Sequence, residues 1–290
     1  MTEGHWLFSY GTLREPAVQQ TLFGRAVEGV ADALTGFTLD HVAITDAEVL
    51  ATSGSDRHPI LRRGSEADQV PGSALWLSAE ELAVVARYEV ADYARMKVEL
   101  ASGREAYVYI DRRDAFEIII PDADLLSHLL PVARRIFSDT FAEHYDETAF
   151  AAFCDEVYCP GGSMSREFGL AEVRWRVATA DGAPIGYAKL TPLRAPAENA
   201  APGALELQQL YVLADWHGCG VADRLMAWAI ETARADGAPE LYLTVFDHNA
   251  RAKRFYTRHG FADVGHCTFQ LGDRIDDDRI WRRRLAGPAA

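Results

Sequence analysis

The sequence predicts an α+β protein of two domains, and three observations lead to this fold class. The chain of 290 residues exceeds the usual length of one domain and is too short for three large ones. Its first part consists of short apolar or alternating runs, whereas its second part alternates helical and extended patterns. Hydrophobic residues make up 49% of the chain and charged residues 25%, so each domain has enough apolar side chains for a core.

The first part of the chain is expected to form strands with one helix among them. Gly, Pro, Asp and Ser separate the runs "HWLFSYG", "TLDHVAI", "GSALWLS", "MKVEL" and "AYVYID", which are typical of strands. The stretch "SAEELAVVARYE" is expected to be a helix, because Ser78 followed by Glu81 forms a capping box. The apolar stripe that follows at helical spacing comprises Leu82, Val85, Ala86 and Glu89.

A change of pattern after Asp111 predicts the domain boundary. The polar stretch "RRDAF" ends the run of strands, and "EIIIPDADLLSHLLPVARRIF" begins a strand followed by a helix. We therefore predict domains at residues 1–115 and 116–290, joined by a linker so short that the domains touch. After two helices, the second domain is expected to contain the strands "EVRWRVAT", "PIGYAKLTP" and "ALELQQLYVL", the helix "VADRLMAWAIETARAD", the strand "ELYLTVF", the helix "NARAKRFYTRH" and a last strand.

Charge and cysteine content narrow the classes of function. The net charge is −14 and divides evenly, because residues 1–115 and 116–290 each carry −7. Nothing in this charge distribution indicates a nucleic-acid-binding protein. An acidic surface weakly attracts cations such as amines, and the alternative is that the charge only keeps the protein soluble. The four cysteines lie in the second half without metal-ligand spacing, and no apolar segment has the length of a membrane span. We expect a soluble cytoplasmic protein with small-molecule substrates, without nucleic-acid or membrane partners and without a metal, and leave a homodimer open.

A turn and a distant carboxylate are the candidate functional residues of the first domain. The strand in "LFSYGTLREP" breaks at Gly11, where successive backbone N–H groups at a sharp turn can hold an anion. Glu89 closes the apolar stripe of the helix, and burial there raises the pKa of a carboxyl group toward neutrality. Each feature also has an ordinary alternative. These are a simple strand turn, and a frayed helix end where Glu89 pairs with Arg87, Arg95 or solvent.

Together, "YGTL" and "YEVADYARMKV" resemble the motifs of the gamma-glutamylcyclotransferase (AIG2-like) family, over roughly residues 5–113. The resemblance implies a small β-barrel around a cavity and a reaction without a cofactor. In that reaction the α-amine of a γ-glutamyl compound attacks its own γ-carbonyl group, closing 5-oxoproline and expelling an amine. Glu89 would act as acid and base, and Tyr93 would line the pocket. The loop implied to bind the substrate's α-carboxylate comprises Tyr10, Gly11, Thr12 and Leu13.

A strand, a glycine-containing loop and a helix mark the candidate site of the second domain. In "LYVLADWHGCGVADRLM", Gly218 and Gly220 allow a ligand to approach closely at a helix N-terminus, where phosphate binds readily. The Lys-Ser/Thr pair of a P-loop and the full Gly-x-Gly-x-x-Gly pattern are missing. Further along, Asn249 is positioned to cap a helix that carries Tyr256 and ends in "HGF".

These features resemble the GNAT superfamily of acyl-CoA-dependent N-acyltransferases, over roughly residues 117–286. The resemblance implies a mixed central sheet and acetyl-CoA as cofactor. Tyr256 would protonate the leaving CoA thiolate, and Asn249 and Lys253 would lie near CoA. Main-chain groups of Leu210, Tyr211 and Val212 would hold the pantetheine arm, and the pyrophosphate would lie on His217, Gly218, Cys219, Gly220, Val221 and Ala222. His217 stands where the family has Gln or Arg, so the expected contacts are those of the main chain.

Strand alternation supplies the candidate base of the second domain. In "LELQQLYV" we expect Glu206, Gln208 and Leu210 on one face, and Leu207, Gln209 and Tyr211 on the other. Glu206 is the candidate for receiving the proton of the amine, and the alternative is a solvent-exposed glutamate on an edge strand. Cys219 is interpreted as a small loop residue rather than a nucleophile.

The ending "GHCTFQLGDRIDDDRIWRRRL" and the stretch "IFSDTFAEHY" resemble the PaiA-type polyamine acetyltransferase branch. This implies a cationic amine substrate near Glu143, Asp146 and Glu147, for which a solvated helix face is the alternative. One domain would release an amine and the other would acetylate it, so we predict a bifunctional enzyme, for example for a γ-glutamyl-polyamine. The alternatives are a noncatalytic metabolite-binding first domain beside an acetyltransferase for a drug or protein amine, and a sensor in which neither pocket is catalytic.

Overall fold

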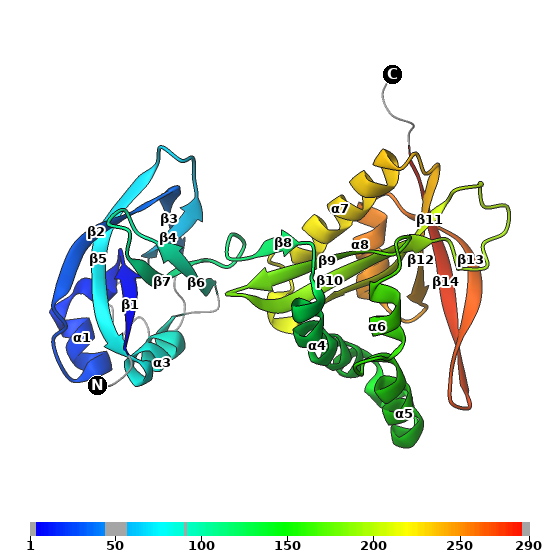
Figure 1. Cartoon of the computed structure of the whole chain (residues 1–290), viewed down its shortest axis with the longest axis horizontal. Coiled ribbons are helices and arrows are strands. Elements are labelled where there is room, and N and C mark those ends of the chain that lie inside the picture. Colours follow the sequence, from blue (N-terminus) through cyan, green and yellow to red (C-terminus); the bar gives the residue numbers. More distant parts are fainter. Residues whose placement is uncertain (1–3, 44–56, 90–91, 286–290) are drawn as a thin grey trace. The chain divides into compact units, whose positions relative to one another are not determined.

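The chain forms two compact units, and each is described by itself. The computed structural model describes residues 4–43, 57–89 and 92–285, and the chain divides into residues 1–116 and 117–290 (Figure 1). The first unit consists mainly of strands, and the second combines helices with a large mixed sheet. The predicted α+β class is therefore confirmed. The boundary predicted after residue 115 lies beside this division, and contact between the domains stays a prediction.

The first unit begins with the strand that leads into the predicted turn. Its elements are β1 (Gly4–Ser9), the 3-10 helix η1 (Thr12–Arg14), α1 (Pro16–Phe23), β2 (Gly29–Thr35), β3 (Phe37–Ala43), β4 (Arg57–Arg63), β5 (Gln69–Ser78), α3 (Ala79–Tyr88), β6 (Tyr93–Glu99) and β7 (Glu105–Asp111). The five predicted strands are confirmed as β1, β3, β5, β6 and β7. β2 and β4 were not predicted, because Gly29, Asp32 and Pro59 belong to residue types that are depleted in strands.

β1 lies in the middle of the first unit's sheet and carries the turn toward the site. The strand order is β2-β5-β1-β7-β6, and neighbours are antiparallel except for the parallel pair β1 and β7. Among the described residues, β3 and β4 pair as a separate hairpin, which packs beside β5 and β7. A side chain at Gly72 of β5 would meet the ring of Phe8 and the carbonyl oxygen of Ser9. Glycine therefore lets β5 and β1 approach closely at this point.

The helix α3 begins at the predicted capping box. The Ser78 hydroxyl accepts a hydrogen bond from the Glu81 N–H at 3.2 Å, and the Glu81 carboxylate accepts one from the Ser78 N–H at 2.9 Å. Arg25 donates two further hydrogen bonds to the same carboxylate. The helix ends at Tyr88, and the next residue, Glu89, has an extended backbone. Local hydrogen bonds of the capping box therefore determine where α3 begins. The residue that follows its last turn, Glu89, lies in the site.

Two residues of the predicted stripe of α3 belong to the core. Leu82 and Val85 are buried, whereas Ala86 is exposed, so the prediction that Ala86 faces inward is wrong. Ala86 lies at the edge of the stripe on the side away from Val85, which leaves it in solvent. The buried partners of the stripe come from β1, η1, α1, β4, β5, β6 and β7, and include Leu7, Leu13, Val18, Ile60, Leu75, Leu77, Tyr93 and Tyr109.

The second unit follows the predicted order of helices and strands. Its elements are β8 (Glu117–Ile119), α4 (Ala123–Phe141), η2 (Ala142–His144), α5 (Glu147–Val157), α6 (Ser163–Phe168), β9 (Arg174–Ala180), β10 (Ala183–Pro192), β11 (Leu205–Val212), η3 (Ala214–Trp216), α7 (Val221–Ala235), β12 (Glu240–Phe246), α8 (Ala250–Arg258), β13 (Ala262–Leu271) and β14 (Arg274–Arg284). The short helix α6 was not predicted, and the predicted last strand is a hairpin of two. No helix within the described ranges has both the length and the apolar character needed to cross a membrane.

A mixed sheet forms the centre of the second unit, as predicted. Its order is β13-β14-β12-β11-β10-β9-β8, and β11 and β12 are its parallel pair. The helices α4 and α7 cover opposite faces of this sheet (Figure 1). On the face of α4 the core is aromatic, with Phe137 stacked on Phe150 at 5.5 Å and with Trp175 and Tyr187 beneath them. The candidate site of this unit lies along β11, beyond its short pairing with β12 and beside the loop before α7.

Candidate active sites

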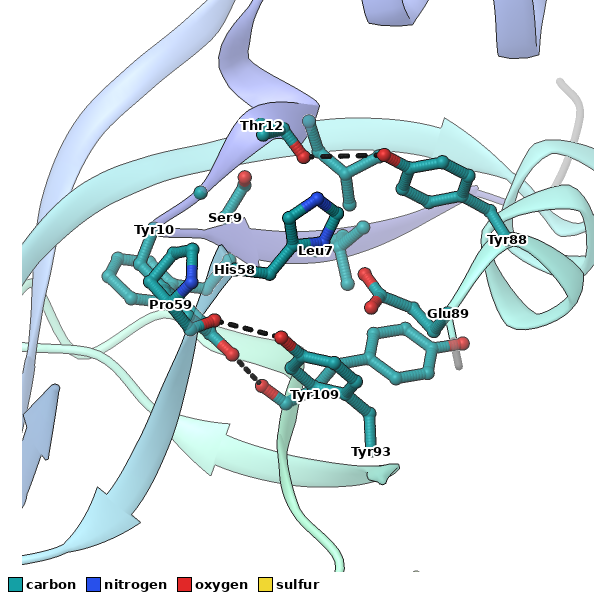
Figure 2. A pocket seen from close by; sticks show the side chains of 13 residues that line it. Leu7, Ser9, Tyr10, Thr12, His58, Pro59, Tyr88, Glu89, Tyr93 and Tyr109 are labelled. Carbon is teal, nitrogen blue, oxygen red and sulfur yellow. Dashed lines mark hydrogen bonds between the residues drawn. The ribbon is translucent and has the colours of Figure 1, made fainter. Parts of the chain in front are cut away.

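One pocket of the first unit gathers side chains from β1, β4, β6, β7 and the end of α3 (Figure 2). The residues predicted for this site all line it, namely Tyr10, Gly11, Thr12, Leu13, Glu89 and Tyr93. The turn and the carboxylate come together because β1 is the central strand and α3 packs against the same core. Residues that were not predicted also line the pocket, among them Ser9, His58, Tyr88 and Tyr109.

The turn after β1 presents main-chain donors to the pocket. Gly11 caps the 3-10 helix η1, and within the described residues the N–H groups of Thr12 and Leu13, at its first positions, have no protein acceptor. We expected glycine here for its backbone freedom, but φ of Gly11 is −128°, outside the left-handed region. A Cβ atom at Gly11 would instead lie 3.2 Å from the Pro59 ring, so close packing against β4 is what favours glycine.

Tyrosine hydroxyl groups fasten the walls of the pocket. Tyr10 donates to the carbonyl oxygen of Tyr109 at 2.7 Å, which ties the turn to β7. Tyr93 donates to the carbonyl oxygen of Pro59 at 3.0 Å, which ties β6 to β4. Burial raises the pKa of both hydroxyl groups, and the charge of Glu89 raises them further, so both stay protonated. Tyr10 and Tyr93 therefore shape the pocket as neutral donors.

Glu89 lies in this pocket with no opposite charge beside it (Figure 2). Burial raises the pKa of its carboxyl group to about 8. Within the described part of the chain, Glu89 forms no ion pair with Arg87 or Arg95, so of the alternatives for this helix end only contact with solvent remains for the partly exposed Glu89. A carboxyl group that titrates near neutral pH can both take and return a proton.

Two polar residues that the sequence analysis missed project into the same pocket (Figure 2). His58, on β4, is 6% exposed, and Ser9, at the end of β1, is 4% exposed. Burial lowers the pKa of His58, so the imidazole is neutral at neutral pH. No local pattern pointed to either residue, because β4 contains a proline between charged side chains and Ser9 is an ordinary residue for a strand end.

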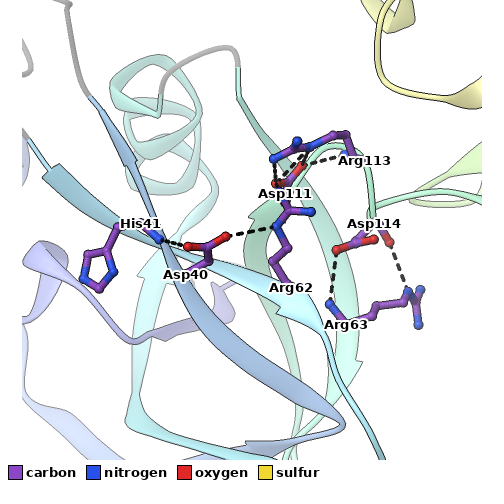
Figure 3. Close-up of polar contacts among 7 residues, drawn as sticks. All are labelled: Asp40, His41, Arg62, Arg63, Asp111, Arg113 and Asp114. Atoms are coloured by element: carbon purple, nitrogen blue, oxygen red, sulfur yellow. Dashed lines mark hydrogen bonds and ion pairs between the residues drawn. The ribbon is translucent and has the colours of Figure 1, made fainter.

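An ion-pair network connects β4 to the end of β7 (Figure 3). The Asp111 carboxylate is 2% exposed, accepts hydrogen bonds from Arg113 at 2.5 and 2.9 Å, and pairs with Arg62 at 3.2 Å. Burial by itself would raise the pKa of Asp111, but the bonds from Arg113 and the charge of Arg62 outweigh it and lower the pKa. The N–H of Arg63 adds a bond to Asp114 at 3.2 Å. These contacts hold the two strands that carry His58 and Tyr109.

In the second unit, β11 carries a β-bulge that changes which side chains share a face. The pairing with β10 skips Gln208, because adjacent residues of β10 pair with the residues on either side of it. Glu206 therefore shares a face with Gln209 and Tyr211. The predicted grouping of Glu206 with Gln208 and Leu210 is wrong, because simple alternation does not continue through a bulge.

β11 and β12 pair only at the start of β11 and separate after that. Their parallel register covers only Leu205 and Glu206 of β11, although this strand continues to Val212. Beyond that point the main chain of β11 has no β12 partner in the described ranges, and its edge is open to a ligand. The residues predicted to hold the pantetheine arm, Leu210, Tyr211 and Val212, lie in this unpaired part.

The predicted base, Glu206, is a buried residue of a central strand. It is 3% exposed and β11 lies inside the sheet, so the alternative of an exposed edge-strand glutamate is wrong. Its Oε2 atom accepts hydrogen bonds from the N–H groups of Arg194 at 2.7 Å and Ala195 at 2.8 Å. Glu206 thus fastens the segment after β10, and this structural role occupies one of its two carboxylate oxygens.

A second carboxylate, Asp278 of β14, lies on the same side of the sheet, opposite Phe246 of β12. Burial and the charges of Asp276 and Asp277 raise the pKa of Asp278 to about 6. Within the described residues no cation pairs with it. After burial, the charge of Asp278 is the further cause that raises the pKa of Tyr211 to about 12. The sequence alone does not indicate which of the three consecutive aspartates, Asp276, Asp277 or Asp278, faces the site.

The loop before α7 has the geometry of an anion site. Gly218 and Gly220 have φ of 80° and 85°, in the left-handed region that favours glycine, and a Cβ atom at either would meet nothing. α7 begins directly afterwards at the buried Val221, with Ala222 and Cys219 partly exposed beside it. The first N–H groups of this long helix and the bare glycine backbone suit a phosphate.

His217 positions a guanidinium group beside this loop. Its Nε2 atom lies 2.9 Å from the carbonyl oxygen of Val212 and must donate there, so Nδ1 accepts from Arg251 at 2.6 Å. Burial lowers the pKa of His217 and keeps this neutral form. The side chain that replaces the usual Gln or Arg therefore holds Arg251 of α8 against β11. Sequence reasoning missed Arg251, because the contact joins residues 34 positions apart.

The predicted residues of α8 have separate tasks. Asn249 caps the helix through its side chain, as predicted, and Lys253 pairs with Asp247 at 2.5 Å. Tyr256 is partly buried, and burial followed by the proximity of Tyr211 raises its pKa well above the usual value. The Tyr256 hydroxyl therefore keeps its proton at neutral pH.

The acidic residues expected near the substrate mouth lie on an exposed connection. Glu143 belongs to η2, and Asp146 and Glu147 lie at the start of α5. The Asp146 side chain accepts from the Ala149 N–H at 3.0 Å and caps α5. One of the three is thus a helix cap, and a role in substrate attraction stays a prediction for the others.

The chain thus combines a small strand-rich domain, whose pocket holds a carboxyl group with a raised pKa, and a mixed-sheet domain with an open strand edge beside a glycine loop. Residues 130–261 match the acetyltransferase (GNAT) family, and residues 7–125 match the family described as gamma-glutamyl cyclotransferase, AIG2-like. The chain belongs to the GNAT acetyltransferase family and carries an AIG2-like domain in front of it.

Relatives with known sequences agree with this assignment. An uncharacterized N-acetyltransferase of Mycobacterium tuberculosis (strain ATCC 25618 / H37Rv) is 37% identical over 118 residues, covering 40% of this chain and 71% of the relative. An uncharacterized N-acetyltransferase from the pepI 3' region of Lactobacillus delbrueckii subsp. lactis is 26% identical over 160 residues, covering 55% and 92%. Among solved structures, the PaiA N-acetyltransferase of Thermoplasma acidophilum in complex with coenzyme A is 22% identical, with a TM-score of 0.48 and coverage of 58% and 98%.

Proposed function

We propose that the chain is a bifunctional enzyme. Its first domain, residues 1–115, releases 5-oxoproline and a free amine from a γ-glutamyl amine. Its second domain, residues 116–290, transfers an acetyl group from acetyl-CoA to a small primary amine. The observation that supports the first activity is the carboxyl group of Glu89, whose pKa is raised to about 8 by burial and which lines one pocket together with the Tyr10–Leu13 turn.

In the first domain the substrate's own α-amine is the nucleophile. Its α-carboxylate binds the main-chain N–H groups of the turn at Gly11, Thr12 and Leu13, which places the amine toward Glu89. The ionised Glu89 takes a proton from the amine as nitrogen attacks the γ-carbonyl carbon. It returns that proton to the leaving nitrogen as the C–N bond breaks. The reaction is intramolecular, so orientation lowers much of the barrier.

In the second domain the donor binds along the open edge of β11. Leu210, Tyr211 and Val212 offer main-chain groups for the pantetheine arm, and the loop from His217 through Gly218, Cys219, Gly220 and Val221 to Ala222 offers N–H groups for the pyrophosphate. Arg251 adds positive charge beside that loop, and Asn249 and Lys253 lie near the rest of CoA. The bound donor supplies the acetyl group, and Tyr256 holds the proton that the leaving thiolate takes up.

The acceptor that we propose is a cationic amine, such as a polyamine. Asp278 supports this class, because it is a partly buried carboxylate beside the Phe246 ring, and carboxylates and aromatic faces both attract ammonium groups. Phe246 itself lies against Phe141 and His144, with ring centroids 6.2 and 5.5 Å away. Asp278 is also placed to receive the proton of the amine, and Glu206 is the alternative base through its second oxygen.

The two reactions share an amine, and we propose that they act in sequence on one compound. A γ-glutamyl-polyamine gives 5-oxoproline and a polyamine in the first domain, and the polyamine is the class of acceptor that the second domain takes. Neither reaction needs any group from the other domain, so each activity is expected to persist when the other is blocked.

One incubation tests this proposal. The purified chain, γ-glutamyl-putrescine and acetyl-CoA are combined, and 5-oxoproline, N-acetylputrescine and free thiol are followed together. We expect all three products, with no N-acetylputrescine when acetyl-CoA is left out. Thiol release without 5-oxoproline would support the alternative of a noncatalytic first domain. Absence of every product across a panel of γ-glutamyl amines and free amines would refute both activities.

A further inference from the structure

We propose that Ser9 and His58 form the wall of the first pocket that binds the γ-carbonyl oxygen of the substrate and stabilises the negative charge that develops on it. This inference rests on the proposed cyclotransferase activity and adds two catalytic residues to it. When the amine attacks, the carbonyl carbon becomes tetrahedral and its oxygen gains negative charge. An O–H or N–H group aimed at that oxygen lowers the barrier. Glu89 is unsuited to this task, since it exchanges protons with the two nitrogens.

The two side chains approach the pocket from different strands (Figure 2). The imidazole of His58 projects from β4 into the space between Thr12 of the turn and the Glu89 carboxylate, and Ser9 lies on the neighbouring part of β1. Each side chain is more than nine-tenths buried, so water competes weakly for its hydrogen bonds. The space between the turn and Glu89 is where the closing ring must lie in the proposed mechanism.

Several other donors in the pocket already have partners. The hydroxyl protons of Tyr10 and Tyr93 go to main-chain carbonyl oxygens of neighbouring strands, and the Tyr88 hydroxyl lies 3.4 Å from that of Thr12. The Ser9 hydroxyl, in contrast, forms no hydrogen bond to another described residue, and the residue as a whole is 4% exposed. Its proton can therefore be donated to an oxygen atom of a ligand in the pocket.

The neutral state of His58 suits it to this role. Burial lowers the pKa of the imidazole, while the charge of Glu15 opposes that shift without overcoming it. A neutral imidazole still carries one N–H donor. A positively charged ring beside Glu89 would instead lower the pKa of that carboxyl group and weaken it as a base. A neutral donor therefore stabilises the oxygen and leaves the raised pKa of Glu89 intact.

The main chain around His58 is held rigidly. Pro59 follows directly, and its ring restricts the backbone. The carbonyl oxygen of Pro59 accepts the Tyr93 hydroxyl at 3.0 Å. His58 pairs with Val42 across the hairpin in register, and Arg62 further along β4 is tied to Asp111. A donor on such a strand needs little rearrangement when charge develops.

The arrangement also defines the class of substrate. In the proposed mechanism the turn binds the α-carboxylate of the substrate, and Glu89 accepts a proton from its α-amine. Ser9 and His58 donate hydrogen bonds to its γ-carbonyl oxygen. Three separate contacts of this kind distinguish the two enantiomers of a substrate that has one chiral carbon atom. We therefore expect turnover of one enantiomer of a γ-glutamyl amide with a free α-amine and a free α-carboxylate, and little turnover of its mirror image or of an N-acylated form.

Variants of His58 test the inference through the kinetic constants. We expect His58→Leu to lower kcat for 5-oxoproline release by about 100- to 1000-fold, with KM changed about threefold or less. His58→Gln retains an N–H donor and should recover about tenfold of that loss. Ser9→Ala should lower kcat about tenfold. His41→Gln is the matched control, because His41 is exposed on the strand paired with β4, and its kcat should stay within about twofold of the wild type.

Other results would overturn the inference. Unchanged kcat in His58→Leu, an effect confined to KM, or equal losses in the leucine and glutamine variants would each show that His58 donates no hydrogen bond in the reaction. An NMR titration separates this test from the proposed function. Adding 5-oxoproline to the full chain with labelled histidine should shift the ring signals of His58 and leave those of His41 in place, even if no γ-glutamyl amine is turned over. Unmoved His58 signals at saturating 5-oxoproline would refute the carbonyl site.

Discussion

The two candidate sites of this chain handle charge in opposite ways. In the first unit the pocket is rich in tyrosine and contains no basic side chain among its described lining residues other than the neutral His58, and burial raises the pKa of Glu89 to about 8. In the second unit, Gly218 and Gly220 of the loop before α7 have left-handed backbone conformations and lie near the surface. Arg251 is held beside this loop by its hydrogen bond to His217. The first site suits proton transfer on a small substrate, and the second suits a large polyanionic donor. Substitutions should therefore affect one activity at a time.

The largest effect is expected for Glu89→Gln. Glu89 is the one carboxyl group among the described residues that line the pocket, and removing it should lower 5-oxoproline release by about 1000-fold or more, since the proposed mechanism assigns both proton transfers to it. Acetyl transfer should be unchanged. Both rates are measured in the same preparation, with circular dichroism as the check on folding. Unchanged 5-oxoproline release would remove Glu89 from the mechanism.

The matching change in the second unit is Tyr256→Phe. Without the hydroxyl group, the thiolate leaves without a proton donor, and we expect kcat of acetyl transfer to fall by about 100-fold. The KM for acetyl-CoA and the release of 5-oxoproline should stay within about twofold. Equal activity of the phenylalanine variant would mean that solvent protonates the thiolate.

Asp278→Asn tests the acceptor class. We expect kcat/KM for putrescine to fall by about 10- to 100-fold, because the variant loses both the partner of the ammonium group and a proton acceptor. The KM for acetyl-CoA should not change. Asp277→Asn is the matched control, since Asp277 is exposed and points to the other face of β14. Similar losses in the two variants would indicate a general effect of surface charge.

A smaller effect is expected for Arg251→Gln. Losing one guanidinium group near the pyrophosphate loop should raise the KM for acetyl-CoA by about tenfold and leave kcat nearly unchanged. With acetyl-pantetheine, which carries no phosphate, the variant and the wild type should have the same KM. Arg254→Gln, an exposed position on the same helix, serves as the control. A raised KM for acetyl-pantetheine would contradict a role in phosphate binding.

A further effect concerns stability rather than activity, and it depends on pH. The pKa of Glu89 is raised from the ordinary 4.5 to about 8, so between these values the folded state binds more protons than the unfolded state. Stability of the wild type should therefore fall as pH rises through this window, by at most about 1.4 kcal/mol per pH unit. Glu89→Gln lacks this slope. Thermal unfolding of both proteins from pH 5 to pH 8 should show a gap that widens in favour of the variant, and parallel curves would mean that Glu89 is ionised when folded.

The features that sequence determined by itself are local ones. The capping box of Ser78 and Glu81 and the cap at Asn249 were predicted correctly, because their hydrogen bonds join residues only three positions apart. The glycines of the loop before α7 were also found from sequence, since a left-handed backbone demands that residue type. The same holds for the α+β class, which follows from local hydrophobic periods.

Only the tertiary structure decided how the sites work. The raised pKa of Glu89 depends on what covers it, and the coverage comes from β1, β4, β6 and β7. His58, Arg251 and Asp278 were missed, because each meets its site through residues distant in the chain. The bulge at Gln208 turned the predicted faces of β11, since register is set by the neighbouring strand. Burial and strand register depend on the whole fold, whereas helix caps and turns depend on residues that are only a few positions apart in the sequence.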